Sequence, residues 1–494
     1  MKGTPVLSIL LLVPLAASVV VLLLPASQAK LIKWFTVVAT GMALAVSLAV
    51  LGAFSVGSSG MQMLETVPWV PSVGMAYKLG IDGLSLPLVL LTTLLCFLSA
   101  LYTLRLEKQV KAFCFLLLLL QIGMIGVFLA LDAVLFYVFW ELVLVPMFFM
   151  IGIWGGDNRR YASVKFFIYT LVGSVIMLLG LLLLYFWGPR TFDLQAIIAW
   201  GQAGKFTLEQ QYWIFGALFL GFAVKVPIFP FHTWLPDAHV EAPTVGSVLL
   251  AGVLLKMGGY GLLRVSLGAL PHAFVDFSPY LAALGVIGIV YGSAVALTQK
   301  DLKKMVAYSS VSHMGFVVLG IAAATSAGVD GAAMQMFTHG IITGMLFFLV
   351  GMIYERYHTK EIAKLRGIIT SVPALGIIFT FACFASLGLP GLAGFVGEFT
   401  SLMGGLQVFP LITAFAVIGI VLTAAYFLRT MQAIIFAPAD DNSALYDGPK
   451  KMAWTELVAV LPLATVALAL GLFPAPYFNI VDPVARTLAS MVGR

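Results

Sequence analysis

The sequence is poor in charge and in cysteine. Only 10% of its 494 residues are charged, against about a quarter in an ordinary soluble domain, while 61% are hydrophobic. This balance excludes a soluble globular protein and leaves no stretch long enough for a soluble domain between apolar runs. The cysteines, Cys96, Cys114 and Cys383, stand alone in apolar segments. With no CxxC pair and no plausible disulfide framework, they indicate neither a metal nor an iron–sulfur cluster.

Apolar runs of about 20 residues, the length that crosses a bilayer, recur along the whole chain. Hydropathy and loop punctuation predict about fourteen spans, which begin near residues 4, 32, 83, 112, 133, 164, 212, 243, 279, 303, 331, 371, 408 and 453. We therefore expect an all-α, polytopic integral membrane protein with one domain over residues 1–494. The first run resembles a signal peptide but leads into another span, so we expect it to be retained. The polar stretch 190–211 predicts an interfacial helix.

Basic residues lie mainly in the short loops that follow odd-numbered spans. The opposite side carries fewer, namely Lys2, Lys78, Arg190, Lys205, Arg264, Arg486 and Arg494. The positive-inside rule then places the odd-numbered loops in the cytoplasm and both termini on the periplasmic side. Since topology accounts for the formal charge of +6, we expect lipid and no nucleic acid as a partner.

Ionisable residues gather near the middle of the membrane. At 1.5 Å per residue, Lys256 lies roughly 12 to 20 Å from either end of a hydrocarbon core about 30 Å thick. The same arithmetic gives similar depths for Glu141, Lys225, His313, His339 and Glu398. A charge at the centre of a span costs on the order of 2.5–3.5 kcal/mol, so this set predicts a function. The structural alternative for each residue is a buried ion pair or an interhelical hydrogen bond.

Two spans are interrupted by helix breakers beside a charge, KVPIFPF in the seventh span and LGLPGLAGFVG in the twelfth. Each is the fourth member of a group of five spans, and an odd number of spans inverts the second group relative to the first. We expect N-terminal helices over 1–111, a first five-helix repeat over 112–270, an inverted repeat over 278–436, and a C-terminal helix and tail over 437–494. Breaks at this depth are tolerated beside protein or water, which favours hydrated cavities.

This set of side chains suits proton transfer. If Glu141 approaches Lys225 to about 5 Å at an effective dielectric of about 20, the attraction is roughly 3 kcal/mol, so withdrawing the carboxylate promotes release of the lysine's proton. Histidines suit a relay, and Glu398 beside a hydrated break suits entry or exit. Asp132 is placed to cap the fifth span. Nothing here requires a bound cofactor.

The segments that carry these residues resemble a known family. FWELVLVPM, KVPIFPFHTWLPDAHVEAPT, LLKMGGYGLLR, AYSSVSHMG, MFTHG and LGLPGLAGFVGEF are similar to the antiporter-like proton-pumping subunits of respiratory complex I. The resemblance covers the whole chain. The acid at Glu398 and the lack of a long lateral helix favour one member of that family.

The resemblance implies that Glu141 pairs with Lys225, that Lys256 and the histidines form a hydrated central axis, and that Glu398 ends the relay. It also implies a membrane arm in a bacterial inner membrane, with homologous antiporter-like subunits on either side. Flavin, iron–sulfur clusters and quinone would then lie in partner subunits. We expect no cofactor in this chain and no redox chemistry of its own.

Other functions remain open at this stage. One is a subunit of a multi-subunit sodium/proton antiporter, which Glu398 disfavours. A membrane cytochrome would use His313 and His339 as axial haem ligands. HTWLPDAHVE offers His232, Asp237, His239 and Glu241 to a metal, although a loop with the two histidines near the proton path is favoured. A membrane scaffold without transport is the remaining alternative.

Overall fold

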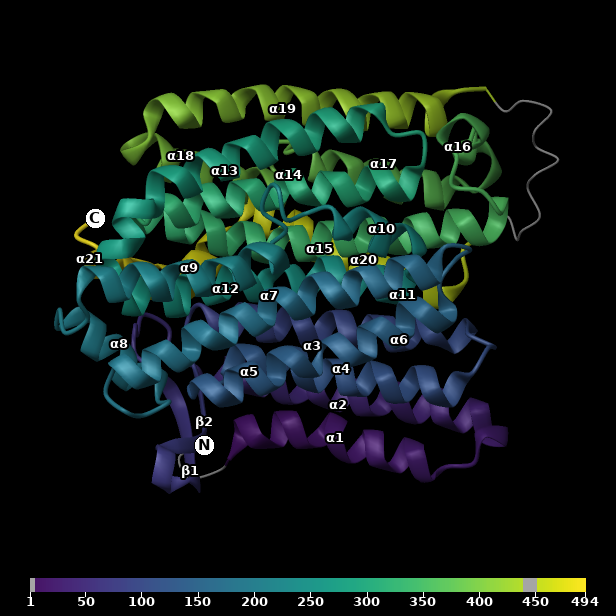
Figure 1. The fold of residues 1–494 in the computed structure, drawn as a ribbon. Coiled ribbons are helices and arrows are strands. Elements are labelled where there is room, and N and C mark those ends of the chain that lie inside the picture. Colours follow the sequence, from purple (N-terminus) through teal and green to yellow (C-terminus); the bar gives the residue numbers. More distant parts are fainter. Residues whose placement is uncertain (1–4, 439–450) are drawn as a thin grey trace.

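The computed structural model describes residues 5–438 and 451–494. Its helices lie side by side and run along one common direction, with connecting segments at the two ends of the bundle (Figure 1). The predicted all-α, polytopic fold is confirmed. Part of the predicted C-terminal segment, residues 439–450, lies outside the described residues.

The chain begins with helices and a hairpin: α1 (Val6–Leu23), α2 (Ala29–Ala53), β1 (Gln62–Val70), β2 (Met75–Ile81) and α3 (Ser85–Tyr102). The next group is α4 (Val110–Leu129), α5 (Ala133–Leu142), α6 (Leu144–Trp154), α7 (Arg159–Trp187), α8 (Leu194–Gln202), α9 (Leu208–Lys225), α10 (Trp234–Glu241), α11 (Thr244–Leu249) and α12 (Leu255–Gly261). The third group is α13 (Pro271–Thr298), α14 (Leu302–Ala323), α15 (Ser326–Tyr357), α16 (Ile368–Ser371), α17 (Pro373–Ser386), α18 (Ala393–Val408) and α19 (Pro410–Met431). The chain ends with α20 (Trp454–Leu472) and α21 (Ala475–Met491).

Within the described residues, 12 helical segments are long and apolar enough to cross a membrane. The other two predicted spans are each divided between shorter helices, α9 with α10 and α17 with α18. The total of about fourteen spans therefore stays a prediction. The predicted positions of both breaks are confirmed.

The spans with the lowest mean hydropathy lie deepest in the bundle. The segment Thr244–Leu267 is 100% buried over its most apolar window, whereas Pro410–Phe436 and Trp454–Leu472 are 33% buried. The buried spans include those that carry Lys256, His313 and His339. Since lipid contact demands apolar side chains, polar residues are retained where protein surrounds them.

A two-stranded antiparallel hairpin, which the sequence analysis did not predict, stands at one end of the bundle (Figure 1). It is bound to its neighbours by charge: Glu65 accepts hydrogen bonds from the backbone N–H groups of Leu7 and Ser8 at the start of α1, and Lys78 pairs with Asp193 at 2.7 Å. A carboxylate at a helix N-terminus satisfies N–H groups that have no intrahelical partner. The hairpin therefore fixes the ends of α1 and α8. The helix predicted within 190–211 is present as α8.

The predicted C-terminal tail forms a helix, α21, against α15. Its buried residues recur at helical spacing: Tyr477, Val481, Val484, Ala485, Leu488 and Ala489. It carries too many polar residues to register as a span, so hydropathy alone missed it.

Arg264 is not a loop residue, which corrects one position in the charge count. It lies in the π-helical segment Leu262–Leu267 and pairs with Asp82 at 2.6 Å, both side chains being buried. A second buried pair joins Arg356 of α15 to Glu456 of α20 at 2.7 Å. These pairs connect helices that are distant in sequence.

Candidate functional site

The first broken helix ends at Lys225, and its freed carbonyl groups find partners within the protein. Pro227 has no N–H to donate to Ala223, whose carbonyl accepts instead from Ile228 N at 2.8 Å. The indole Nε1 of Trp234 donates to the carbonyl of Val224 at 2.9 Å. The break is thus stable in an apolar surrounding because its backbone remains hydrogen-bonded.

Lys225 is 2% exposed, and its Nζ lies 5.2 Å from the ring centroid of Trp140. Glu141, the next residue after Trp140, is half-buried, and its Oε1 has no hydrogen-bond partner among the described residues. The charges of Glu141 and Lys225 interact, although no ion pair within 4.0 Å joins them in the described chain. The lysine is therefore held by an aromatic face and stays within reach of a carboxylate.

Lys256 lies in α12, between π-helical segments Leu250–Leu254 and Leu262–Leu267. Its side chain is 0% exposed. The Nζ donates to the carbonyl of Ala251 and lies 2.6 Å from Nδ1 of His339. An ammonium can only donate, so with Lys256 charged the ring of His339 accepts at Nδ1 and carries its proton on Nε2. The wider π-helical turns accompany this contact between a lysine and its own backbone.

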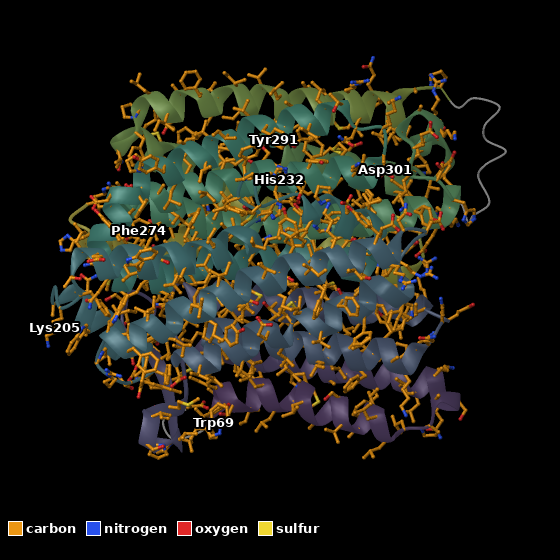
Figure 2. All side chains as sticks on the ribbon, in the orientation of Figure 1. Trp69, Lys205, His232, Phe274, Tyr291 and Asp301 are labelled. Atoms are coloured by element: carbon orange, nitrogen blue, oxygen red, sulfur yellow. The ribbon has the colours of Figure 1, made fainter. Side chains whose placement is uncertain are left out.

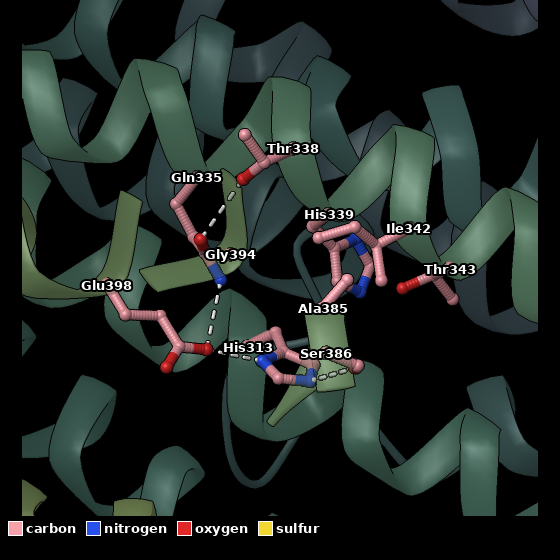
Figure 3. A pocket seen from close by; sticks show the side chains of 10 residues that line it. All are labelled: His313, Gln335, Thr338, His339, Ile342, Thr343, Ala385, Ser386, Gly394 and Glu398. Carbon is pink, nitrogen blue, oxygen red and sulfur yellow. Dashed lines mark hydrogen bonds and ion pairs between the residues drawn. The ribbon is translucent and has the colours of Figure 1, made fainter. Parts of the chain in front are cut away.

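His339, on α15, faces His313, on α14, with ring centroids 5.7 Å apart. Nδ1 of His313 lies 2.6 Å from Oε1 of Glu398, and Nε2 lies 3.1 Å from Oγ of Ser386 (Figure 3). Glu398 Oε1 also accepts from Gln335 Nε2 at 3.3 Å. A sequence of neighbouring ionisable groups therefore runs from Lys256 through both histidines to Glu398.

The second broken helix brings Ser386 and Glu398 to the same imidazole. α17 ends at Ser386 and α18 begins at Ala393; between them, Gly388 has φ +82° and Gly391 has φ +92°. These dihedrals lie in the left-handed region that favours glycine. The chain thus reverses tightly enough for residues on both sides of the break to contact His313.

A small cavity lies among these groups (Figure 3). It is bordered by both histidines and by Gln335, Thr338 and Glu398. Its free space is about that of one water molecule. Nε2 of His339, which has no hydrogen-bond partner among the described residues, belongs to a ring that borders this cavity. A polar cavity next to an unsatisfied nitrogen is suited to hold water.

The three remaining predicted residues belong neither to the Glu141 and Lys225 unit nor to this chain of contacts. Asp132 caps α5 by accepting from the N–H groups of Val134 and Leu135, as predicted, and also binds the hairpin at Ala76 N. His232 packs against Tyr291 with ring centroids 5.1 Å apart, and the two lie together in Figure 2. His239 stacks on Phe347 at 4.6 Å.

The contacts of the histidines argue against the haem and metal alternatives. Both ring nitrogens of His313 already have protein partners, so neither is free for iron. His232 packs edge to face against Tyr291, whereas His239 stacks on Phe347, so the two histidines contact different aromatic rings. The searched part of the chain, 5–438 and 451–494, holds no group of three or more His, Cys, Asp or Glu side chains that could bind a metal ion.

The sequence analysis missed the uncharged members of the site: Trp140, Gln335, Thr338 and Ser386. The polar ones look like ordinary polar residues of a span. Ser386 contacts His313 and Gln335 contacts Glu398, while the hydroxyl of Thr338 donates to Gln335. One signal was available in the sequence. Gln335 precedes Thr338 by three residues and His339 by four, and residues at these spacings are neighbours on a helix surface.

This chain is similar to a known protein family and to several named proteins. The family described as "NADH:quinone oxidoreductase/Mrp antiporter, TM" matches residues 130–423. NADH-quinone oxidoreductase subunit M of Rhodobacter capsulatus is 44% identical over 97% of this chain and 95% of its own length. NAD(P)H-quinone oxidoreductase chain 4 of a Synechococcus strain is 41% identical over 95% and 90%, respectively.

Solved structures resemble the whole chain. A chain of respiratory complex I from Thermus thermophilus matches with a TM-score of 0.89 and 32% identity, covering 99% of this chain and 100% of that one. A chain of the Mrp complex from a Dietzia species matches with a TM-score of 0.86 over 100% of both chains. At 21% identity, the second likeness concerns the fold alone.

Proposed function

The chain belongs to the NADH:quinone oxidoreductase/Mrp antiporter family, and from that premise we propose that it is the proton-translocating subunit M, or chain 4, of an NADH-quinone oxidoreductase. It acts in the membrane arm, where it moves protons while electron transfer takes place in partner subunits. The observation that carries this proposal is the buried sequence of contacts Lys256, His339, His313 and Glu398.

Each step of the proposed relay uses a neighbouring pair. A proton leaves the Lys256 ammonium for Nδ1 of His339, which is 2.6 Å away. Nε2 of His339 releases its proton to water in the cavity, which passes a proton to the Ser386 hydroxyl, and that hydroxyl gives its own proton to Nε2 of His313. From Nδ1 of His313 it passes to the Glu398 carboxylate, also 2.6 Å away. Histidine suits the middle steps because its proton affinity lies near neutrality and both ring nitrogens exchange protons.

Glu141 and Lys225 form the second unit of the proposal. They interact without an ion pair in this conformation, so a small movement of either side chain changes the attraction between them. At an effective dielectric of about 20, approach to about 5 Å is worth roughly 3 kcal/mol, enough to change whether Lys225 holds its proton. We assign to this pair the switch that connects partner subunits to the relay.

The proposed arrangement in the membrane follows the charge asymmetry. The loops after odd-numbered spans face the cytoplasm, and both termini face the periplasm of a bacterial inner membrane. Homologous antiporter-like subunits lie on either side of this one. Flavin, iron–sulfur clusters and quinone belong to partner subunits.

The five-helix groups over 112–270 and 278–436 act as inverted repeats in this proposal. Their broken helices support it, since α9 and α10 follow one another from left to right in Figure 1, whereas α17 and α18 follow from right to left. Each repeat then contributes one broken helix beside one ionisable group, Lys225 or Glu398.

A sodium/proton antiporter subunit is the competing assignment. It is supported by the fold shared with the Mrp complex at 21% identity. The relatives named subunit M share 40% to 44% identity over 97% of the chain, which favours the oxidoreductase.

The test is proton pumping by the assembled complex with Glu141→Ala or Lys225→Ala. We expect NADH-driven acidification of inverted vesicles to fall by about tenfold or more, the scale of losing a proton-transfer group. Glu209→Ala, an exposed carboxylate on the same helix as Lys225, is the control and should pump normally. Normal pumping by the Glu141 or Lys225 variant, with assembly verified, would sink the proposal.

A further inference from the structure

An open cavity lies where the start of α15 meets α21, away from the relay itself. Its lining includes Ser326 and Asp330 of α15, Thr400 of α18, Asp482 of α21 and Arg494. Figure 2 places Asp301 at one end of the bundle and Phe274 at the other. α14 begins beside Asp301 and runs to the far end, so α15 begins at the end that also holds the hairpin.

Asp330 is a buried carboxylate directed into this cavity. It is 7% exposed, and its Oδ1 has no hydrogen-bond partner among the described residues. Its neighbour across the helix interface is Asp482, with which it makes a side-chain contact. Two carboxylates in contact repel unless a proton is shared between them. Arg486 balances one of the two negative charges, so one proton on the pair makes the cluster neutral.

Asp482 connects the pair to the surface. Its Oδ1 accepts from Ser326 Oγ at 3.1 Å, and its Oδ2 pairs with Arg486 Nε at 2.8 Å. The side chain of Arg486 is 74% exposed, so this partner lies at the surface of the chain. Arg494 also lines the cavity, but its guanidinium donates to the carbonyl groups of Ala322 and Ala323.

Close packing of α15 on α18 brings Asp330 near the helix that carries Glu398. Gly331, the next residue, packs directly on the backbone of Ser401: a Cβ there would stand 2.2 Å from Ser401 N. Ser401 follows Glu398 by one turn of α18, and its buried Oγ has no hydrogen-bond partner within the described chain. A hydroxyl with unused bonding capacity can accept a proton and donate another, as a relay requires.

We propose that Asp330 and Asp482 form a proton-exchange site through which Glu398 exchanges protons with the aqueous phase, with Ser401 between them. The inference rests on the proposed function. In this proposal α21 belongs to the proton pathway, since that helix supplies Asp482, one of the two carboxylates. A proton that reaches Glu398 passes to the Ser401 hydroxyl, which releases its own proton to the carboxylate pair; from there the proton enters water beside Arg486.

The experiment compares carboxylate variants in the assembled complex, reconstituted in vesicles and driven by NADH and a quinone. Asp330→Asn keeps the shape of the side chain and removes the exchangeable proton, so pumping should fall by roughly threefold or more. Asp330→Glu keeps the acid and should recover most of that loss. Asp276→Asn, an exposed carboxylate near the start of α13 that contacts Tyr212 instead of the cavity, should leave pumping unchanged.

Glu398→Gln separates the two proposals. If this variant loses pumping while Asp330→Asn and Asp482→Asn pump normally, the relay stands and the exchange site is wrong. If Glu398→Gln itself pumps normally, the proposed function fails as well. If Asp330→Glu is as defective as Asp330→Asn, the position is needed for packing and the exchange site is overturned. Loss in both Asn variants with recovery in Asp330→Glu supports it.

Discussion

Lys256 has no carboxylate within ion-pair distance among the described residues. Two uncharged hydrogen-bond acceptors take the place of a carboxylate. The Ala251 carbonyl and Nδ1 of His339 receive its N–H groups. Neither acceptor carries a full negative charge, so the lysine is less strongly held in its charged form than it would be beside a glutamate. A residue held in this way is suited to release and regain a proton.

Ser386 is predicted to position His313 through its hydrogen bond to Nε2. Ser386→Ala leaves that nitrogen without a partner, which costs about 1–3 kcal/mol and shifts where the ring keeps its proton. Since about 1 kcal/mol changes a population ratio roughly fivefold, we expect a severalfold loss of proton pumping in assembled complex. Thr380→Val is the control, because Thr380 on the same helix donates to the carbonyl of Gly376. Equal pumping by both variants would remove Ser386 from the site.

For single residues, the sequence could predict which ionisable groups lie deep in the membrane, but not which side chains contact one another. Depth counted along each helix identified Lys256, His313, His339 and Glu398, which the structure brings together. It could not identify Ser386, because a serine inside a span carries no cost that demands an explanation. Whether each of these residues carries protons stays a prediction.

Among the elements, each of the two broken helices places a break beside an ionisable group, and the two breaks are stabilised in different ways. In the first, Trp234 Nε1 and Ile228 N supply hydrogen bonds that the prolines remove. In the second, Gly388 and Gly391 take left-handed backbone conformations. Both means leave an ionisable group beside a break without leaving the backbone unpaired.

Gly388→Ala is expected to impair the second break. A non-glycine residue at its φ of +82° costs about 1–3 kcal/mol. The new Cβ would also stand 3.3 Å from Oε2 of Glu398. We expect a lower midpoint of thermal inactivation and reduced pumping.

The matched substitution is Gly216→Ala. Gly216 lies within α9, and no atom lies within 4 Å of the Cβ that it would gain. Alanine is favoured over glycine inside a helix by roughly 0.5–1 kcal/mol, so this variant should be at least as stable as the original. If Gly388→Ala matched it in stability and pumping, the backbone argument would be wrong.

Hydropathy with proline and glycine punctuation located nearly every helix and both breaks. It missed the hairpin, which lies outside any span and whose first strand is mostly exposed while its second strand ends in the buried residues Leu79 and Ile81. It also missed α21, where an apolar face on one side is balanced by polar residues on the other. Both are secured by tertiary contacts that no local pattern reports: Glu65 to the start of α1, and Tyr477 Oη to the carbonyl of Ala333.

In the molecule as a whole, the spans with the lowest mean hydropathy lie inside. The ion pairs Asp82 with Arg264 and Arg356 with Glu456 are buried at positions that link early, middle and late helices. Removing one partner of such a pair leaves an uncompensated charge, so these links favour one arrangement of the bundle. The relay then keeps its geometry because the side chains of Lys256, His313, His339 and Glu398 are all buried among packed helices.

The orientation is tested by labelling with a membrane-impermeant maleimide. The native cysteines are buried, so introduced ones report their own side. Ser59→Cys, before the hairpin, should react in right-side-out vesicles, because the positive-inside rule places that end in the periplasm. Lys364→Cys, in a basic loop, should react in inverted vesicles only. The reverse pattern would invert the proposed topology.

The central claim is that protons cross this subunit through the buried contacts between Lys256 and Glu398. The most direct measurement is NADH-driven proton pumping by assembled complex carrying His339→Phe, which keeps a ring of similar size but removes the nitrogens between Lys256 and His313. The control is His272→Phe at an exposed histidine. The account predicts that pumping is abolished in the first variant and unchanged in the second. Pumping at the control rate by the His339 variant would contradict it.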